Sequence, residues 1–156
     1  MRKSMLLFLG VAVGCSSGSS PVSPVRANAI EAAHVLVGGA PVEGAVVVGE
    51  RGVTVFQVRL RDRDASSLAG VRRMVLRYDI PGMGMMGNRV GEVLCYDDAT
   101  HGDDIAGDGV FHRLDSDGSM GCGGATSPAG AYGYGFQCDT IAGGSCGEMM
   151  LHVTRR

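Results

Sequence analysis

The residues with the clearest chemical potential in this chain are concentrated in one acidic segment, residues 96–111. Its five aspartates are Asp97, Asp98, Asp103, Asp104 and Asp108. Carboxylates at this density repel one another unless their charge is compensated. Two arrangements provide this: the aspartates accept hydrogen bonds from backbone N–H groups in Asx turns, or several of them share a hard cation through their oxygens.

The spacing within this segment bears on the choice between turn and metal site. The candidate calcium ligands are Asp97, Asp98, Asp103 and Asp108. An EF-hand is excluded, because no D-x-D-x-D-G run is followed by a glutamate at the twelfth position. Gly102, Gly107 and Gly109 predict a tightly folded backbone, which suits both alternatives. Since the turn chemistry of aspartate alone explains the pattern, we expect a structural turn that needs no cofactor, with calcium binding as the alternative.

A second motif, at residues 82–87, fits the dinucleotide pattern G-x-G-x-x-G. A strand is expected to begin only a few residues later, which leaves no room for the helix that would bind pyrophosphate. We therefore expect a glycine-rich hairpin loop. Its methionines, Met83, Met85 and Met86, could bind Cu(I) through their thioethers, but methionine is more often an adaptable packing residue.

No catalytic residue is predicted. Residues 143–147 fit G-x-S-x-G, but a nucleophile elbow needs a following helix and a later acid and histidine in a large α/β domain. Only His152 follows this motif. The four histidines lack metalloprotease spacing, and His101 is expected to bond a neighbouring turn carboxylate rather than a metal. The sequence thus favours a protein that is not an enzyme.

Alternation of apolar and polar residues predicts the elements that carry these segments. In residues 71–80, Met74, Leu76, Tyr78 and Ile80 share one face, which is typical of a half-buried strand. Residues 131–138 and 148–153 repeat the pattern, another strand is expected at 52–61, and shorter strands are expected at 34–37, 45–49, 91–96 and 109–114. An apolar phase shift between Val55 and Phe56 predicts a bulge or a strong twist. Residues 30–37 are ambiguous between helix and strand, and no other helix is expected.

Composition agrees with many short strands. The 156 residues include 26 glycines, no tryptophan and only 5% aromatic residues. We expect an all-β fold, a single immunoglobulin-like antiparallel β-sandwich of about seven or eight strands. The net charge is −2, and no basic patch argues for nucleic acid as a partner.

The amino terminus predicts export. Arg2 and Lys3 precede the mostly apolar residues 5–13, as in a secretory signal, and this stretch is shorter than the roughly 20 residues of a membrane span. Residues 12–15 (A-V-G-C) resemble the lipobox of bacterial lipoproteins. The resemblance implies cleavage before Cys15, lipid on Cys15 and anchoring to a membrane of the cell envelope. By analogy, Ser16 after the cysteine favours sorting to the outer membrane. The alternative to a lipoprotein signal is an ordinary signal peptide in which Cys15 carries no lipid.

The expected organisation is then a signal peptide at 1–14, the lipidated cysteine with a Ser/Pro-rich tether at 15–27, and one sandwich domain at 28–156. In an exported chain, the remaining four cysteines favour two disulfides. Cys138 and Cys146 flank a predicted hairpin loop and are the favoured pair, which leaves Cys95 with Cys122. A zinc site is disfavoured because no C-x-x-C pair is present.

The acidic segment also supports a resemblance. The run D-D-A-T-H-G-D-D-I-A-G-D-G-V-F at residues 97–111 resembles an element of immunoglobulin-like modules in bacterial exported proteins. Ala99 departs from the glycine usual at its position. The resemblance covers roughly residues 45–154, nearly one domain. It implies a β-sandwich accessory module without catalytic activity, and we expect it to bind an envelope protein or glycan, or to be structural.

Overall fold

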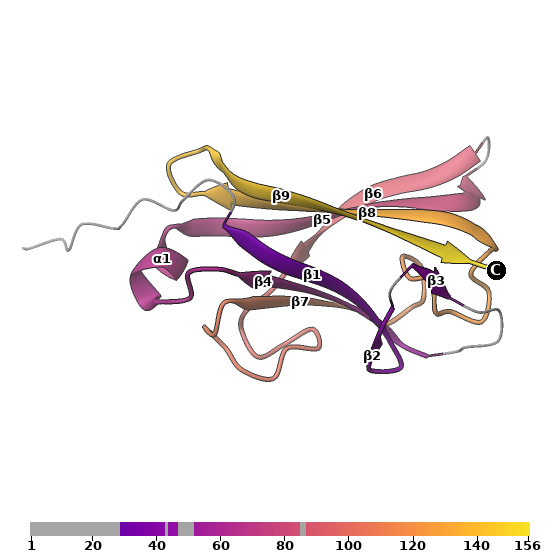
Figure 1. Ribbon diagram of the computed structural model, residues 1–156, viewed down its shortest axis with the longest axis horizontal. Helices are drawn as coiled ribbons and strands as arrows, with labels where there is room; N and C mark the ends of the chain where they lie inside the picture. Colours follow the sequence, from indigo (N-terminus) through magenta and orange to yellow (C-terminus); the bar gives the residue numbers. More distant parts are fainter. Residues whose placement is uncertain (1–28, 43, 47–51, 85–86) are drawn as a thin grey trace, which may run out of the picture.

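The computed structural model describes residues 29–42, 44–46, 52–84 and 87–156, which form two β-sheets packed face to face (Figure 1). The strands are β1 (Ile30–Val37), β2 (Ala40–Pro41), β3 (Ala45–Val46), β4 (Thr54–Leu60), β5 (Val71–Gly84), β6 (Gly87–Cys95), β7 (Val110–Asp115), β8 (Gly130–Thr140) and β9 (Ser145–Arg155), and one helix, α1, spans Ala65–Ala69. The predicted all-β sandwich is confirmed.

The strand order is that of an immunoglobulin-type sandwich. One sheet has the order β2-β1-β4-β7 and the other β3-β9-β8-β5-β6. All pairings are antiparallel except that of the two-residue β3 with β9. If β1, β4 and β7 are equated with strands A, B and E, then β5, β8 and β9 correspond to C, F and G, with β6 as the added edge strand beside C.

The core forms where the inner faces of the two sheets meet, and alternation places its side chains. On β8, Tyr132, Tyr134 and Phe136 point inward and are fully buried, as predicted. Phe56 on β4 packs against Tyr134 with ring centroids 4.8 Å apart. Each such ring removes a large apolar area from water, which makes these contacts the main source of stability.

A tyrosine corner ties β8 to the loop that precedes it. Tyr132, near the start of β8, donates a hydrogen bond from its hydroxyl to the carbonyl oxygen of Pro128 at 2.7 Å. The same device marks the E–F connection of immunoglobulin domains. The carboxylate of Asp115, at the end of β7, accepts hydrogen bonds from the Ser119 and Gly121 N–H groups at 3.0 and 2.5 Å. Burial raises the pKa of Asp115.

Two local features differ from expectation. Of the bulge or strong twist expected between Val55 and Phe56, the bulge is absent, because β4 pairs in regular register with β7 throughout residues 54–59; the twist stays a prediction. Val55 instead faces outward, where the loop between β6 and β7 covers it at Gly102. The helix α1 was not expected because it has only five residues. Its signal was Asp64, whose carboxylate caps the helix by accepting hydrogen bonds from two N–H groups. The ambiguous residues 30–37 form β1.

One of the two expected disulfides is present. Cys138 and Cys146 form a disulfide across the β8–β9 hairpin, with their Cα atoms 5.1 Å apart, and this pair was predicted. The second predicted pair is wrong, since Cys95 and Cys122 are free, buried thiols. Burial raises the pKa of Cys95 to about 12, which suppresses its reactivity as a thiolate.

The strand register explains why Cys95 and Cys122 do not meet. Cys95 belongs to the cross-strand row that contains Cys138 and Gly147. The backbone carbonyl of Cys122 accepts a hydrogen bond from Arg155, which lies eight residues beyond Gly147 on β9. Eight strand residues extend about 26 Å, whereas a disulfide needs Cα atoms within about 7 Å. The two thiols therefore lie too far apart along the strands to form a disulfide.

The predicted signal peptide, Cys15 and the tether lie outside the described residues, so lipidation stays a prediction. No helix among the described residues has the length and apolar character needed to cross a bilayer.

The G-x-G-x-x-G motif lies in a hairpin, since Gly84 pairs with Gly87. Met85 and Met86 fall outside the described residues. Residues 143–147 turn from β8 directly into β9.

Candidate functional site

The acidic loop, residues 97–109, connects β6 of one sheet to β7 of the other. Reciprocal backbone hydrogen bonds between Tyr96 and His112, at 2.8 and 2.7 Å, close its base. The loop packs on the outer face of the four-stranded sheet: a Cβ atom at Gly102 would lie 3.4 Å from Val55 and 3.7 Å from Leu114. The acidic loop is thus a cover for part of this outer face.

Asp97 organises the end of the loop. Its carboxylate accepts hydrogen bonds from the N–H groups of Gly107, Asp108 and Gly109 at 2.6, 3.2 and 2.9 Å. Gly107 and Gly109 have φ values of 73° and 78°, in the left-handed region that glycine adopts without strain. Successive N–H groups in such a turn form a concave anion-binding nest, which the Asp97 side chain fills.

Asp103 fixes the loop to the sheet below it. Only 1% of its side chain is exposed, and its Oδ1 lies 3.1 Å from Nδ1 of His112 on β7. The other ring nitrogen of His112 lies 2.9 Å from the Gln57 side-chain amide on β4. Nδ1 lacks hydrogen-bond geometry toward Asp103, so the two side chains are joined by a close polar contact rather than a hydrogen bond. His112 was not predicted, because nothing in its sequence neighbours indicates this contact.

The structure brings together three of the four predicted metal ligands. Asp97, Asp103 and Asp108 each place an oxygen within 4.8 Å of the others. Asp98 is not part of this cluster; it accepts a hydrogen bond from the Thr100 N–H at 3.0 Å. His101 also lies outside the cluster, and its ring stacks on Tyr96 at 4.1 Å.

Backbone hydrogen bonds account for all three clustered carboxylates. Besides the bonds of Asp97, Asp103 accepts from the Ala99 N–H at 2.8 Å and Asp108 from the Val110 N–H at 2.9 Å. Bonds of this kind are those expected of structural Asx turns. A calcium ion would have to use the remaining oxygen lone pairs, because carboxylate oxygens can accept from a backbone donor and bind a metal together.

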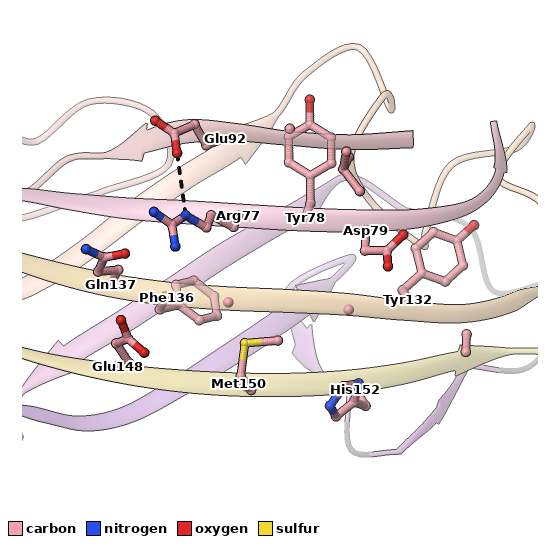
Figure 2. A pocket seen from close by; sticks show the side chains of 15 residues that line it. Arg77, Tyr78, Asp79, Glu92, Tyr132, Phe136, Gln137, Glu148, Met150 and His152 are labelled. Carbon is pink, nitrogen blue, oxygen red and sulfur yellow. Dashed lines mark hydrogen bonds and ion pairs between the residues drawn. The ribbon is translucent and has the colours of Figure 1, made fainter. Parts of the chain in front are cut away.

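A second candidate site is a groove on the outer face of the five-stranded sheet (Figure 2). Its volume is about 710 Å³, and its lining comes from β5, β6, β8 and β9. Gly133 and Gly135, the outward-facing residues of β8, form the floor. Because these two glycines have no side chains, the side chains of the neighbouring strands β5 and β9 form walls on both sides of β8.

The strand register fixes which side chains face one another across the floor. Gly135 lies between Arg77 on β5 and Met150 on β9. In the next row, Gly133 lies between Asp79 and His152. Figure 2 shows these side chains along the two walls. The groove is therefore a direct product of the alternation on β8.

Three large apolar side chains are exposed on this outer face, beside its charged residues. Val90 and Leu94 on β6 are 72% and 39% exposed, and Met150 on β9 is 61% exposed. Together they account for three of the six large apolar side chains exposed among the described residues. Of these three, Val90 and Met150 line the groove, so part of its surface is apolar.

Ion pairs organise part of the charge on this face. Arg77 pairs with Glu92 across β5 and β6 at 3.5 Å, and Arg73 pairs with Asp139 at 2.6 Å. The hydrogen bond from Arg73 holds the pKa of Asp139 below its ordinary value. The sequence did contain a signal for the groove. Met150, Gly133 and Gly135 stand at the outward-facing positions of predicted strands, where polar side chains are usual.

No family model matches the chain, and no curated protein is significantly similar to it. The acidic loop and the groove are therefore interpreted from the geometry of the chain itself.

The hydrogen bonds of Asp97 predict a structural cost for its removal. Asp97→Ala should lower the free energy of unfolding by about 2 kcal/mol, because it leaves N–H groups of the nest without an acceptor. The exposed Asp104 provides the control, and Asp104→Ala should change stability by less than about 0.5 kcal/mol. Urea unfolding followed by circular dichroism measures both. Equal effects of the two substitutions would contradict the role assigned to Asp97.

Proposed function

We propose that this protein is a non-enzymatic binding module of the cell envelope, anchored by lipid on Cys15, and that a protein partner docks in the groove over Gly133 and Gly135. The observation that carries the proposal is the groove itself, a hollow of about 710 Å³ on a sheet face with exposed apolar side chains. Methionine and aliphatic side chains around a concave site are typical of protein-binding surfaces.

The asymmetry between the two outer faces supports this choice of face. The chain uses its own acidic loop to cover part of the four-stranded sheet, including Val55 and Leu114. Within the described residues, no comparable loop covers Val90, Leu94 or Met150 on the other sheet. Docking of a partner would remove these exposed apolar side chains from water.

The anchoring part of the proposal rests on the sequence. A short basic start, an apolar stretch and small residues before Cys15 are together the pattern of a lipoprotein signal. Two or three acyl chains hold a protein stably at a membrane, whereas one chain gives only marginal binding. The Ser/Pro-rich residues 16–25 would then act as a tether between the lipid and the sandwich.

The anchor is tested by Cys15→Ser. Mass spectrometry of the purified wild-type protein should give the mass of a chain that begins at Cys15 and carries acyl groups. The variant should lack the acyl mass and leave the membrane fraction, while Cys95→Ser should keep both. A wild-type protein without added mass, or a variant that stays on the membrane, would contradict lipid anchoring.

The docking face is tested by site-specific photo-crosslinking in cells. A p-benzoylphenylalanine residue replaces Met150 in the groove or, as a control, the exposed Arg59 on the opposite sheet. We expect a discrete protein adduct from position 150 and none of the same mass from position 59. The absence of an adduct specific to position 150 would argue against docking at this face.

Calcium binding is the second candidate function, favoured by the grouping of Asp97, Asp103 and Asp108 within 4.8 Å. If the cluster is a calcium site, calorimetric titration should give heat, and saturation at 100 times the Kd should add about 2.7 kcal/mol of stability. Asp108→Asn should abolish both effects. No heat, and melting curves that coincide with and without a chelator, would remove this alternative and leave the structural turn.

A further inference from the structure

We infer that the partner presents a basic, extended polypeptide segment to the groove, in which lysine or arginine side chains are interspersed with apolar ones so that basic side chains reach both walls. This inference rests on the proposed function and specifies the chemistry of the partner at the same site. It follows from the shape of the groove and from its charge, which are independent features.

The dimensions of the groove fit one extended chain. The floor follows β8 from Ala131 to Gln137, a length of about 20 Å at the rise of a strand. The walls come from β5 and β9 on either side of β8, and so stand about 10 Å apart. An extended segment lying along the floor would direct alternate side chains to the two walls.

The walls carry an excess of negative charge. The charged residues that line the groove are Asp79, Glu92 and Glu148, against the single guanidinium of Arg77. Arg77 is already paired with Glu92. Among the described residues, Asp79 and Glu148 are exposed and have no ion-pair partner. Two free carboxylates thus remain, Asp79 on one wall and Glu148 on the other (Figure 2).

The apolar part of the segment would pack on Met150. The sulfur of Met150 reaches over the floor, since a Cβ atom at Gly135 would lie 2.8 Å from it. Its flexible side chain can adapt to an apolar side chain entering beside it. A basic segment with interspersed apolar residues therefore satisfies the free carboxylates and covers the exposed thioether at once.

A second copy of this chain is a poorer occupant. Face-to-face pairing would bring Asp79 and Glu148 of both copies into one interface, while the Arg77 of each copy is already paired with Glu92. Like charges brought together at an interface cost several kcal/mol and disfavour that partner. The charge pattern thus selects a basic partner over self-association.

The test combines the crosslinker at position 150 with removal of the free charges. Asp79→Asn with Glu148→Gln should lower the adduct yield about tenfold, because each lost ion pair weakens binding. The control, Asp104→Asn with Glu31→Gln, removes the same charge from exposed sites outside the groove and should leave the yield unchanged. Peptide mapping should place the adduct in a partner segment rich in lysine or arginine.

A direct measurement uses the purified mature protein and a synthetic peptide in which pairs of lysines alternate with pairs of leucines, so that an extended chain presents lysine to both walls. Fluorescence anisotropy should detect binding to the wild type and the control, weakened about tenfold in the groove variant. A matched glutamate–leucine peptide should not bind.

Three outcomes would overturn the inference: equal adduct yields in the groove and control variants, binding of both peptides, or an adduct formed with a second copy of the chain. The first two would leave the docking face in place and refute only its preference for basic segments. Loss of the position-specific adduct in the wild type would instead refute the proposed function itself.

Discussion

The alternation of side chains along β8 is the constraint on which most of this structure depends. Every second residue is a large aromatic that points into the sandwich, and the residues between Tyr132, Tyr134 and Phe136 are glycines. The inward set holds the two sheets together by removing apolar area from water. The outward set leaves a hollow on the other side. A single strand thus supplies three fully buried aromatic side chains of the core and the floor of the candidate binding groove.

The two outer faces of the sandwich differ in whether a loop covers them. The acidic loop closes on itself through Asp97 and is held to the four-stranded sheet through Asp103 and His112. Its carboxylates take the place of an external anion at backbone N–H groups, so the acidic run is first of all a folding device. The five-stranded sheet receives no such cover among the described residues, which is why function is assigned to that face.

Local patterns predicted the local features. Alternation identified most of the long strands and the inward residues of β5, β8 and β9, and the hairpin placed Cys138 beside Cys146. Features that depend on which strands are neighbours could not be predicted from the sequence. The separation of Cys95 from Cys122, the contact of Asp103 with His112 and the walls of the groove all follow from register between strands distant in sequence. Ala99, with a φ of 58°, occupies a left-handed position where the resemblance has glycine.

The glycine floor places folding and binding in competition at the same two positions. Glycine is among the weakest strand formers, and a larger residue at position 133 or 135 would favour the strand conformation. Such a change would leave the inward aromatics untouched but fill the hollow, and at position 135 it would displace the mobile end of Met150. The chain could therefore gain stability while losing its surface for a partner. Retention of glycine at these two sites in natural variants would be a sign of selection for binding rather than for folding.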